Sequence, residues 1–234
     1  MDNFYRFVYG IEWFYIPNKR KDVVKEQMPS SNNTVSINTD KDILSLMKKL
    51  EDEVLSCKKC NLSLNRNNVV FGEGSLNAKL MFIGEGPGYM EDKKGRPFVG
   101  RAGLLLDKMI KAMGYKREEV YIANIVKCRP PNNRVPTKDE AAMCLPYLIK
   151  QIGHIKPEVI ICLGSSAANY LLNINMSITK IRGSIRELKL KINNSNLKIK
   201  VIPTYHPAYL LRNPNKKAES WQDLQKAMSI LKDL

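Results

Sequence analysis

No run of about 18 apolar residues occurs in this sequence, so a membrane-spanning helix is not expected. The opening residues, MDNFYRFVYGIEWFYIP, are aromatic but lack the basic start and the small-residue cleavage site of a signal peptide. Cysteines number five, and an odd count in a chain without an export signal argues against a disulfide framework and for metal binding or burial. These absences predict a cytoplasmic protein without membrane contact.

Acidic residues are few, because 23 Asp and Glu stand against 38 Lys and Arg, and the formal net charge is +15. Such a charge predicts attraction to a polyanion such as nucleic acid. A lysine-rich proteome would give the same composition, so charge alone does not identify the partner. With 44% hydrophobic residues, the 234-residue chain can bury a core of ordinary size.

The first 38 residues differ in composition from the rest. Seven of the chain's aromatic residues lie within the first fifteen positions, and the charged stretch NKRKDVVKE and the polar linker PSSNNTVSINTD follow. We expect this extension to cover the body of the same molecule, with a docking site for a partner as the alternative. Helical spacing begins at Asp40, with Thr39 or Asp40 as N-cap, so one globular domain is expected over residues 39–234.

Short apolar runs alternate with helical patterns along this domain. The runs cover residues 79–84, 120–125, 159–164 and 198–206, and the helical patterns cover residues 101–114, 137–153, 165–174 and 216–234. Alternation of this kind predicts an α/β fold with three layers, α/β/α, around a central, mainly parallel four-stranded sheet. In addition, ELKLKI and LKIKVI flank NNSN and alternate apolar with charged residues. This pattern predicts a hairpin with one face exposed to solvent.

An unusual loop follows each of the four predicted strands. The loops contain GEGPG, NIVKCRPPNNR, LGSSA and YHPAYLLRNP. Because ligands bind at the carboxyl ends of strands in open α/β sheets, we expect the functional site there. GEGPG by itself resembles a phosphate-binding turn, but Pro87 removes a backbone donor, and neither G-x-G-x-x-G nor a P-loop lysine follows.

Four of the cysteines form a candidate metal site. Cys57 and Cys60 make a C-x-x-C pair, and Cys128 and Cys144 follow without a local histidine. Four thiolates suit a structural zinc or an iron–sulfur cluster, and the second pair is too widely spaced for a standard zinc ribbon. Ordinary buried thiols are the third interpretation. Cys162, within VIICLG, is predicted to be a buried strand residue.

Taken together, the motifs resemble those of the family 4 uracil-DNA glycosylases, the iron–sulfur type found in bacteria and archaea. The resemblance covers roughly residues 40–234 and rests on GEGPG, GRPFVGRAG, VYIANIVKCRPPNNRVPTKDE, TYHPAYLLRNP and the four cysteines, which occur in the right order. It implies hydrolytic removal of uracil from DNA, which leaves an abasic site. It also implies a 4Fe-4S cluster held by Cys57, Cys60, Cys128 and Cys144.

The sequence departs from the family at one position of the turn. The family usually has Ala where Gly86 stands. Another family of uracil glycosylases has an aspartate there, which orients the attacking water, and neither Ala nor Gly can do so. Glu85 is therefore our candidate for orienting the water or gating the pocket, with Asn133 as the second candidate.

Three side chains have the chemistry that a flipped uracil needs. The resemblance gives His206 the role of donating a hydrogen bond to a uracil oxygen as negative charge develops there. Asn124 can accept from N3 and donate to O4 of uracil, whereas cytosine presents the opposite pattern. Phe98 would stack on the base. Ordinary structural roles are the alternatives for all three.

The remaining candidates surround these three residues. Gly84, Gly86 and Gly88 would let the chain turn tightly against a flat base. Leu210 and Leu211 are candidates for a wedge that fills the gap left by the base, and Arg212 would contact the DNA backbone. No lysine is placed to form a Schiff base, so strand cleavage is not expected. We expect a monomer, and the rival interpretation is a non-catalytic, zinc-containing nucleic-acid-binding module.

Overall fold

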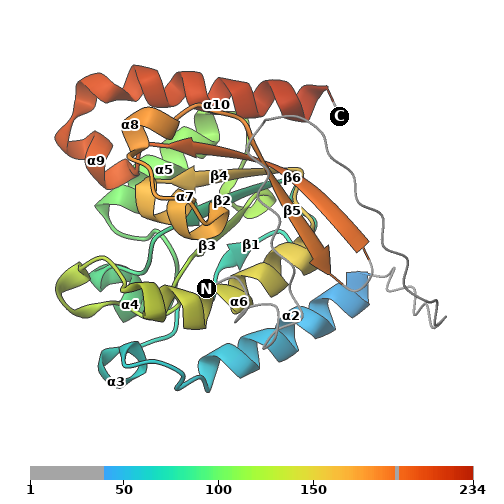
Figure 1. Cartoon of the computed structure of the whole chain (residues 1–234), viewed down its shortest axis with the longest axis vertical. Helices are drawn as coiled ribbons and strands as arrows, with labels where there is room; N and C mark the ends of the chain where they lie inside the picture. The colour runs from blue at the N-terminus through green and yellow to red at the C-terminus, as the bar shows by residue number, and fades with distance from the viewer. Residues whose placement is uncertain (1–39, 193–194, 234) are drawn as a thin grey trace.

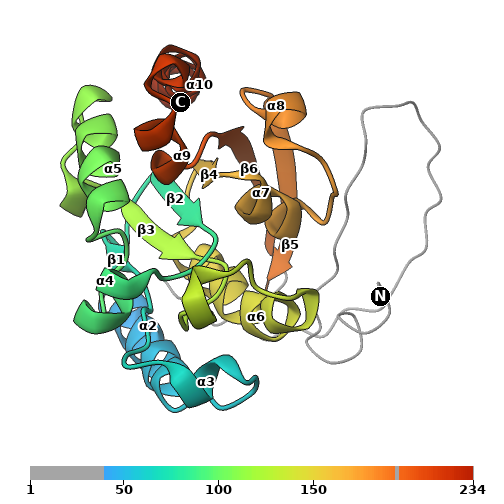
Figure 2. The same cartoon turned by 90° about the vertical axis from the view of Figure 1, so that its left-hand side faces the viewer.

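A computed structural model describes residues 40–192 and 195–233 of the chain. The predicted extension, residues 1–38, and the N-cap candidate Thr39 lie outside the described residues. The described part forms three layers, with a sheet between two groups of helices (Figures 1 and 2). The prediction of an α/β/α fold is therefore confirmed.

The sheet has six strands in the order β1-β3-β2-β4-β6-β5. In chain order the strands are β1 (Glu73–Gly74), β2 (Leu80–Gly84), β3 (Tyr121–Asn124), β4 (Val159–Leu163), β5 (Arg186–Ile192) and β6 (Ser195–Thr204). The four strands expected from the apolar runs, β2, β3, β4 and β6, are mutually parallel and form the centre of the sheet. The expected hairpin is the antiparallel pair β5–β6.

Each edge of the sheet carries one antiparallel strand in addition to the four central ones, and only β1 was not expected from the sequence. At one edge lies β5, the outer strand of the hairpin. At the other edge β1 pairs with β3 over two residues, Glu73 with Ile122 and Gly74 with Tyr121. A two-residue strand has no periodicity that a sequence pattern could reveal.

Helices cover both faces of the sheet. One face carries α2 (Asp40–Leu55), α6 (Lys138–Ile155), α7 (Ser165–Leu172) and α8 (Ile178–Ile181), and the other carries α5 (Arg101–Ala112) and α10 (Lys217–Lys232). The short elements are α3 (Leu62–Asn65), α4 (Tyr89–Lys94), α9 (Pro207–Arg212) and the 3-10 turns η1 (Arg117–Glu119), η2 (Pro131–Asn133) and η3 (Pro214–Lys216).

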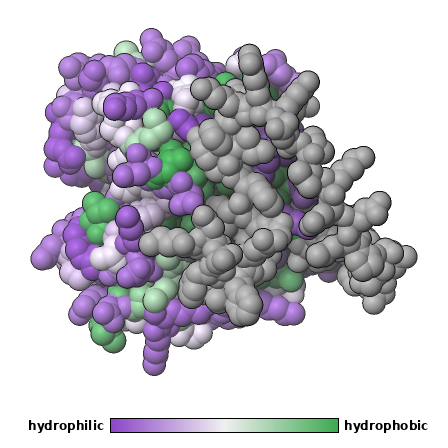
Figure 3. Space-filling view, viewed as in Figure 1, coloured by the Kyte–Doolittle hydropathy of each residue, from purple (hydrophilic) through white to green (hydrophobic). Residues whose placement is uncertain are grey.

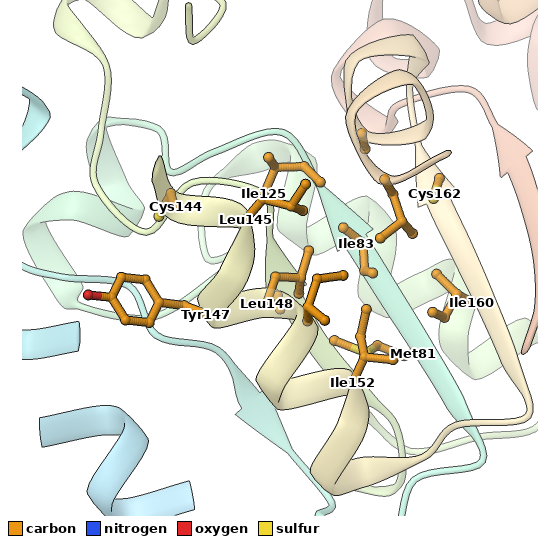
Figure 4. Packing of buried hydrophobic residues seen from close by; sticks show 14 of the residues in the cluster. Met81, Ile83, Ile125, Cys144, Leu145, Tyr147, Leu148, Ile152, Ile160 and Cys162 are labelled. Carbon is orange, nitrogen blue, oxygen red and sulfur yellow. The ribbon is translucent and has the colours of Figure 1, made fainter. Parts of the chain in front are cut away.

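Two hydrophobic cores result, one on each face of the sheet. In β2 successive side chains alternate between them, so that Phe82 packs toward α5 while Met81 and Ile83 pack toward α6. Figure 4 shows Leu148 and Ile152 of α6 lying against the side chains of β2 and β4. Strands covered on both faces are apolar throughout, which explains the continuous hydrophobic runs of the sequence.

The helix α6 starts at a well-formed cap. Thr137 Oγ1 accepts a hydrogen bond from Glu140 N at 3.2 Å, and the Glu140 carboxylate accepts one from Thr137 N at 2.8 Å. Arg134 donates to both carboxylate oxygens of Glu140, at 2.8 and 2.7 Å. This cap fixes the loop before α6 against the helix that carries Cys144.

The described surface on the face drawn in Figure 3 is mainly hydrophilic, with small, separate apolar patches. No helix within residues 40–192 and 195–233 is long and apolar enough to cross a membrane.

Candidate active site

A cavity of about 500 Å³ lies at the carboxyl ends of the four parallel strands. Residues at or just after the end of each central strand line it. They are Glu85, Gly86, Pro87 and Gly88 after β2, and Asn124 at the end of β3. Leu163, Gly164, Ser165 and Ser166 line it around the end of β4, and His206 lines it after β6. The cavity therefore lies where the sequence led us to expect the functional site, at the point where the unusual loops follow the strands.

Asn124 is the last residue of β3 and is only 1% exposed. Its Oδ1 is one of two buried side-chain polar atoms in the described part of the chain that have no hydrogen-bond partner, the other being Glu158 Oε2. Gly84 lies beside it on β2, and a Cβ at this glycine would overlap Asn124 Oδ1 and lie 2.6 Å from the Phe98 ring. Glycine at this position thus leaves the amide open to the cavity.

His206 is the N-cap of α9 and lines the same cavity. Its Nδ1 accepts a hydrogen bond from Ala208 N at 3.1 Å, which assigns the proton of the neutral ring to Nε2. Burial, and to a smaller degree Arg212, lower the pKa of His206 to about 4, while Glu91 opposes the change. The imidazole is therefore neutral at physiological pH and retains Nε2–H as a donor.

Phe98 has a left-handed backbone, with φ of 49°, which is rare for a bulky residue. Its ring centroid lies 5.7 Å from that of His206, and its side chain is 6% exposed. Glu91 Oε1 accepts hydrogen bonds from the next two backbone amides, Val99 N at 2.9 Å and Gly100 N at 2.8 Å. The carboxylate thus holds the turn that places the ring at the cavity.

Glu85 also lines the cavity, and burial raises the pKa of its carboxyl group above the ordinary value of 4.5. A hydrogen bond from Ser166, in the first turn of α7, opposes this rise. Asn133, the second candidate for orienting water, lines the cavity too, but its Oδ1 already accepts a hydrogen bond from Arg129 Nε at 2.7 Å.

A second, smaller cavity brings the four candidate metal ligands together. Cys57 and Cys60, between α2 and α3, Cys128, after β3, and Cys144, in α6, all line it, together with Arg66 and Lys127. Arg66 Nη1 donates to Cys128 Sγ at 3.0 Å, and Lys127 N donates to Cys144 Sγ at 3.2 Å. Cys162, as predicted, is a fully buried residue of β4.

The donor set around the second cavity has the chemistry of an iron–sulfur site. Four cysteine thiols line one small cavity, and two of them accept hydrogen bonds from nearby N–H groups. A four-iron cluster spreads its four cysteine ligands over several metal atoms, and hydrogen bonds to sulfur are typical around such clusters. Burial raises the pKa of the Cys144 thiol to about 12, while Lys127 favours the thiolate. The residues therefore fit an iron–sulfur cluster.

Hydrogen bonds to Asp92 of α4 connect the chain segment after the first two cysteines to the loop that lines the main cavity. Asp92, which is fully buried, accepts hydrogen bonds from Asn67 N at 2.9 Å, Asn67 Nδ2 at 2.5 Å and Asn68 N at 3.2 Å. Asn67 and Asn68 follow Arg66, whose guanidinium contacts Cys128. The segment that carries the first two cysteines is thereby fixed to the helix that follows Gly88.

Comparison with known proteins identifies the family. The model of the uracil DNA glycosylase superfamily matches residues 71–225. Similar curated proteins are the type-4 uracil-DNA glycosylases of Thermotoga maritima, 49% identical over 191 residues (80% of this chain and 95% of the relative), and Sulfurisphaera tokodaii, 48% identical over 189 residues (79% and 84%). The chain belongs to the type-4 uracil-DNA glycosylases. It is a hydrolytic enzyme of DNA repair that excises uracil and leaves an abasic site.

In the glycosylase, the two leucines of the predicted wedge differ in their exposure to solvent. Leu210 is 1% exposed and packs inside the molecule, whereas Leu211 is 37% exposed. Only Leu211 is therefore free to contact DNA, and the expectation that both leucines do so does not fit the buried position of Leu210. Arg212, the next residue, lines the cavity and is exposed.

Among the lining residues of the glycosylase's cavity that were not singled out in the sequence, Glu91 and Ser166 hold other residues of the site in place. Glu91 holds the Phe98 turn, and Ser166 is a hydrogen-bond partner of Glu85. Acidic residues in the first turn of a helix are commonplace, so Glu91 gave no distinct signal. The serines of LGSSA could have been found, because they follow a strand end and begin a helix.

Proposed function

We propose that Asn124, His206 and Phe98 bind the flipped uracil in the main cavity and that Glu85 orients the attacking water. The unpartnered amide oxygen of Asn124 carries this assignment. An unpaired buried acceptor costs about 1–3 kcal/mol, so it is expected where a ligand supplies the missing donor. The N3–H group of uracil is such a donor.

The side-chain amide of Asn124 would select uracil over cytosine through both its oxygen and its nitrogen. Oδ1 of Asn124 would accept from N3–H, and its amide nitrogen would donate to O4 of uracil. Cytosine has an acceptor at N3 and a donor at N4, so it would leave both ends mismatched. The desolvated position of Asn124 makes such a mismatch costly.

Departure of uracil places negative charge on the base, and His206 is our candidate for stabilising it. A neutral imidazole with its proton on Nε2 is a fixed donor that needs no proton transfer. The Phe98 ring would stack on the base beside this donor. Glu85, in its ionised form, would orient water on the other side of the bond that breaks. Leu211 would fill the gap in the DNA, and Arg212 would contact its backbone.

The four cysteines Cys57, Cys60, Cys128 and Cys144 would hold a 4Fe-4S cluster. When bound, the cluster would cross-link three chain segments that surround the pocket and would take no part in the hydrolysis. A zinc site remains the rival of this assignment. Purified protein that is brown and contains iron would support the cluster, and colourless, zinc-rich protein would overturn it.

A uracil-containing oligonucleotide tests the site. Cleavage by alkali at the position of the uracil reports excision, and His206→Ala is expected to lower kcat about 100-fold or more because one fixed donor is lost. Asn124→Asp is expected to weaken uracil excision and to admit cytosine, whose N4 amino group can donate to a carboxylate. Asn196→Asp, on the exposed β5–β6 hairpin, is the matched control. Full turnover by His206→Ala would exclude the leaving-group role.

The proposal also covers the substrate, the cellular location, the oligomeric state and the domain organisation of the enzyme. DNA is the substrate, and we place the protein in the cytoplasm as a monomer. Residues 39–234 would form the catalytic domain, with residues 1–38 as an extension that covers it.

A further inference from the structure

Tyr89 is an exposed aromatic residue beside the main cavity. Of the described aromatic side chains it alone has more than half of its surface exposed, at 55%. It is the first residue of α4 and directly follows Gly88, which lines the cavity. The ring therefore lies next in the chain to a wall of the cavity in which we place the flipped uracil.

Arg129 lies against this ring. Its guanidinium carbon is 5.2 Å from the ring centroid of Tyr89, and its Nε donates to Asn133 Oδ1 at 2.7 Å. Pro130, the next residue, and Asn133 both line the cavity. The ring and the cation thus come from the loops after β2 and β3, two of the loops that form the pocket.

Neither burial of the ring nor an ion pair of the cation explains this arrangement. The Tyr89 ring is mostly in water, so it contributes little apolar burial. Arg129 makes no ion pair with any described residue, unlike Arg96, Arg117, Arg134 and Arg182. An exposed ring with an uncompensated cation over it is a pair that recognises nucleobases by stacking and phosphates by charge.

We infer that Tyr89 and Arg129 form a subsite for the nucleotide next to the uracil on the same strand. This inference rests on the proposed uracil pocket, because it requires that the cavity hold the flipped base. The Tyr89 ring stacks on the neighbouring base, and the Arg129 guanidinium contacts the phosphate between the two nucleotides. Stacking on a side chain requires a base that is free of its own helix, so the subsite favours single-stranded DNA over paired DNA.

Single-stranded oligonucleotides with one uracil test the subsite. Three substrates are needed: a normal strand and two strands in which the nucleotide on the 5′ or on the 3′ side of the uracil lacks its base. Tyr89→Ala is expected to lower kcat/KM on the normal strand about tenfold, whereas Tyr89→Phe, which keeps the ring, retains it. On one of the two base-deficient strands, Tyr89→Ala and the unaltered enzyme should be equally slow, because no base is there to stack.

Further arms of the same experiment separate the possible causes. Leu44→Ala removes an equally exposed side chain, 61% exposed, from α2 and is expected to leave kcat/KM unchanged. Arg129→Gln is expected to reduce by about one the slope of log(kcat/KM) against log salt concentration. On paired DNA the loss caused by Tyr89→Ala should be smaller than on a single strand.

Two results would overturn the subsite. One is a normal rate for Tyr89→Ala on the single strand, and the other is a loss of the same size on both base-deficient strands. Failure of the pocket assignment is a different result, since Asn124→Ala would then still excise uracil at the normal rate.

Discussion

The proposed role of Asn124 has a cost in stability. Its buried oxygen has no partner in the free protein, which is unfavourable, and in the proposed complex the N3–H group of uracil would supply the missing donor. Leucine has nearly the same shape and no polar atom to satisfy. We expect Asn124→Leu to raise the free energy of unfolding by about 1 kcal/mol, measured by urea denaturation, while uracil excision is lost. A variant that is both less stable and inactive would contradict the assignment.

Glu85 should determine the acid limit of activity. Burial raises the pKa of its carboxyl group, so the ionised form that orients water is lost at a higher pH than for an ordinary glutamate. The fall in kcat/KM on the acid side should therefore be centred above pH 4.5. Glu85→Gln should be slow, and its kcat/KM should not show this fall on the acid side. The control Glu118→Gln, at the surface turn η1, should show the same fall as the unaltered enzyme.

At the residue scale, the sequence predicted which side chains line the cavity better than which way each one faces. Asn124, Phe98 and His206 were expected to meet, and all three line one cavity. Leu210 and Leu211 looked equivalent because both follow the histidine. In the helix α9 neighbouring residues point about 100° apart, so one leucine enters the core while the other faces outward.

Among the elements, the short helix α4 holds one wall of the pocket through Glu91. Glu91 connects it to the two amides after Phe98 and offsets the strain of a positive φ at an aromatic residue. Glu91→Ala should therefore release the turn and slow excision, whereas Glu91→Gln, which keeps an acceptor oxygen, should retain most of the rate.

A double-mutant cycle distinguishes positioning from general weakening. If Glu91 acts through the ring, Glu91→Ala should cause no further loss of kcat/KM in a Phe98→Ala background. Additive losses would show that Glu91 acts independently of the ring. Glu119→Ala is the matched control, because this carboxylate also accepts a backbone hydrogen bond, from Lys116 N at 2.7 Å, but in an exposed turn.

The principal elements were predictable because the pattern that specifies them is local. Four apolar runs became the parallel strands, and Lys138–Ile155 and Lys217–Lys232 are helices close to the expected ranges. The strand β1 was not predicted, because its two residues, which pair with β3, are too few to show a strand pattern in the sequence. Its place depends on contacts between distant segments, which a single sequence does not display.

For the whole molecule, His206 links the pocket to acid stability. In the unfolded chain its pKa is ordinary, 6.5, and in the folded protein it is about 4. Between these values the unfolded state binds more protons, so the stability that is complete above pH 6.5 falls as the pH decreases toward 4. The two values correspond to about 3 kcal/mol.

Urea unfolding at a series of pH values measures this effect. His206→Asn is the informative variant, because asparagine can still cap α9 but does not titrate. Between pH 6.5 and pH 4, the free energy of unfolding of this variant should fall by about 3 kcal/mol less than that of the unaltered protein. An identical pH dependence in both proteins would show that the imidazole is not responsible.

The buried carboxylate of Asp92 has a consequence for local opening of the molecule. It binds Asn67 and Asn68 from one side and belongs to the first turns of α4 on the other. Neither segment can move away without breaking the same three hydrogen bonds, so both open in a single event. In amide hydrogen exchange, residues 67–68 and 92–95 should therefore exchange at a common rate, and the cysteine site and the uracil pocket should lose their order together.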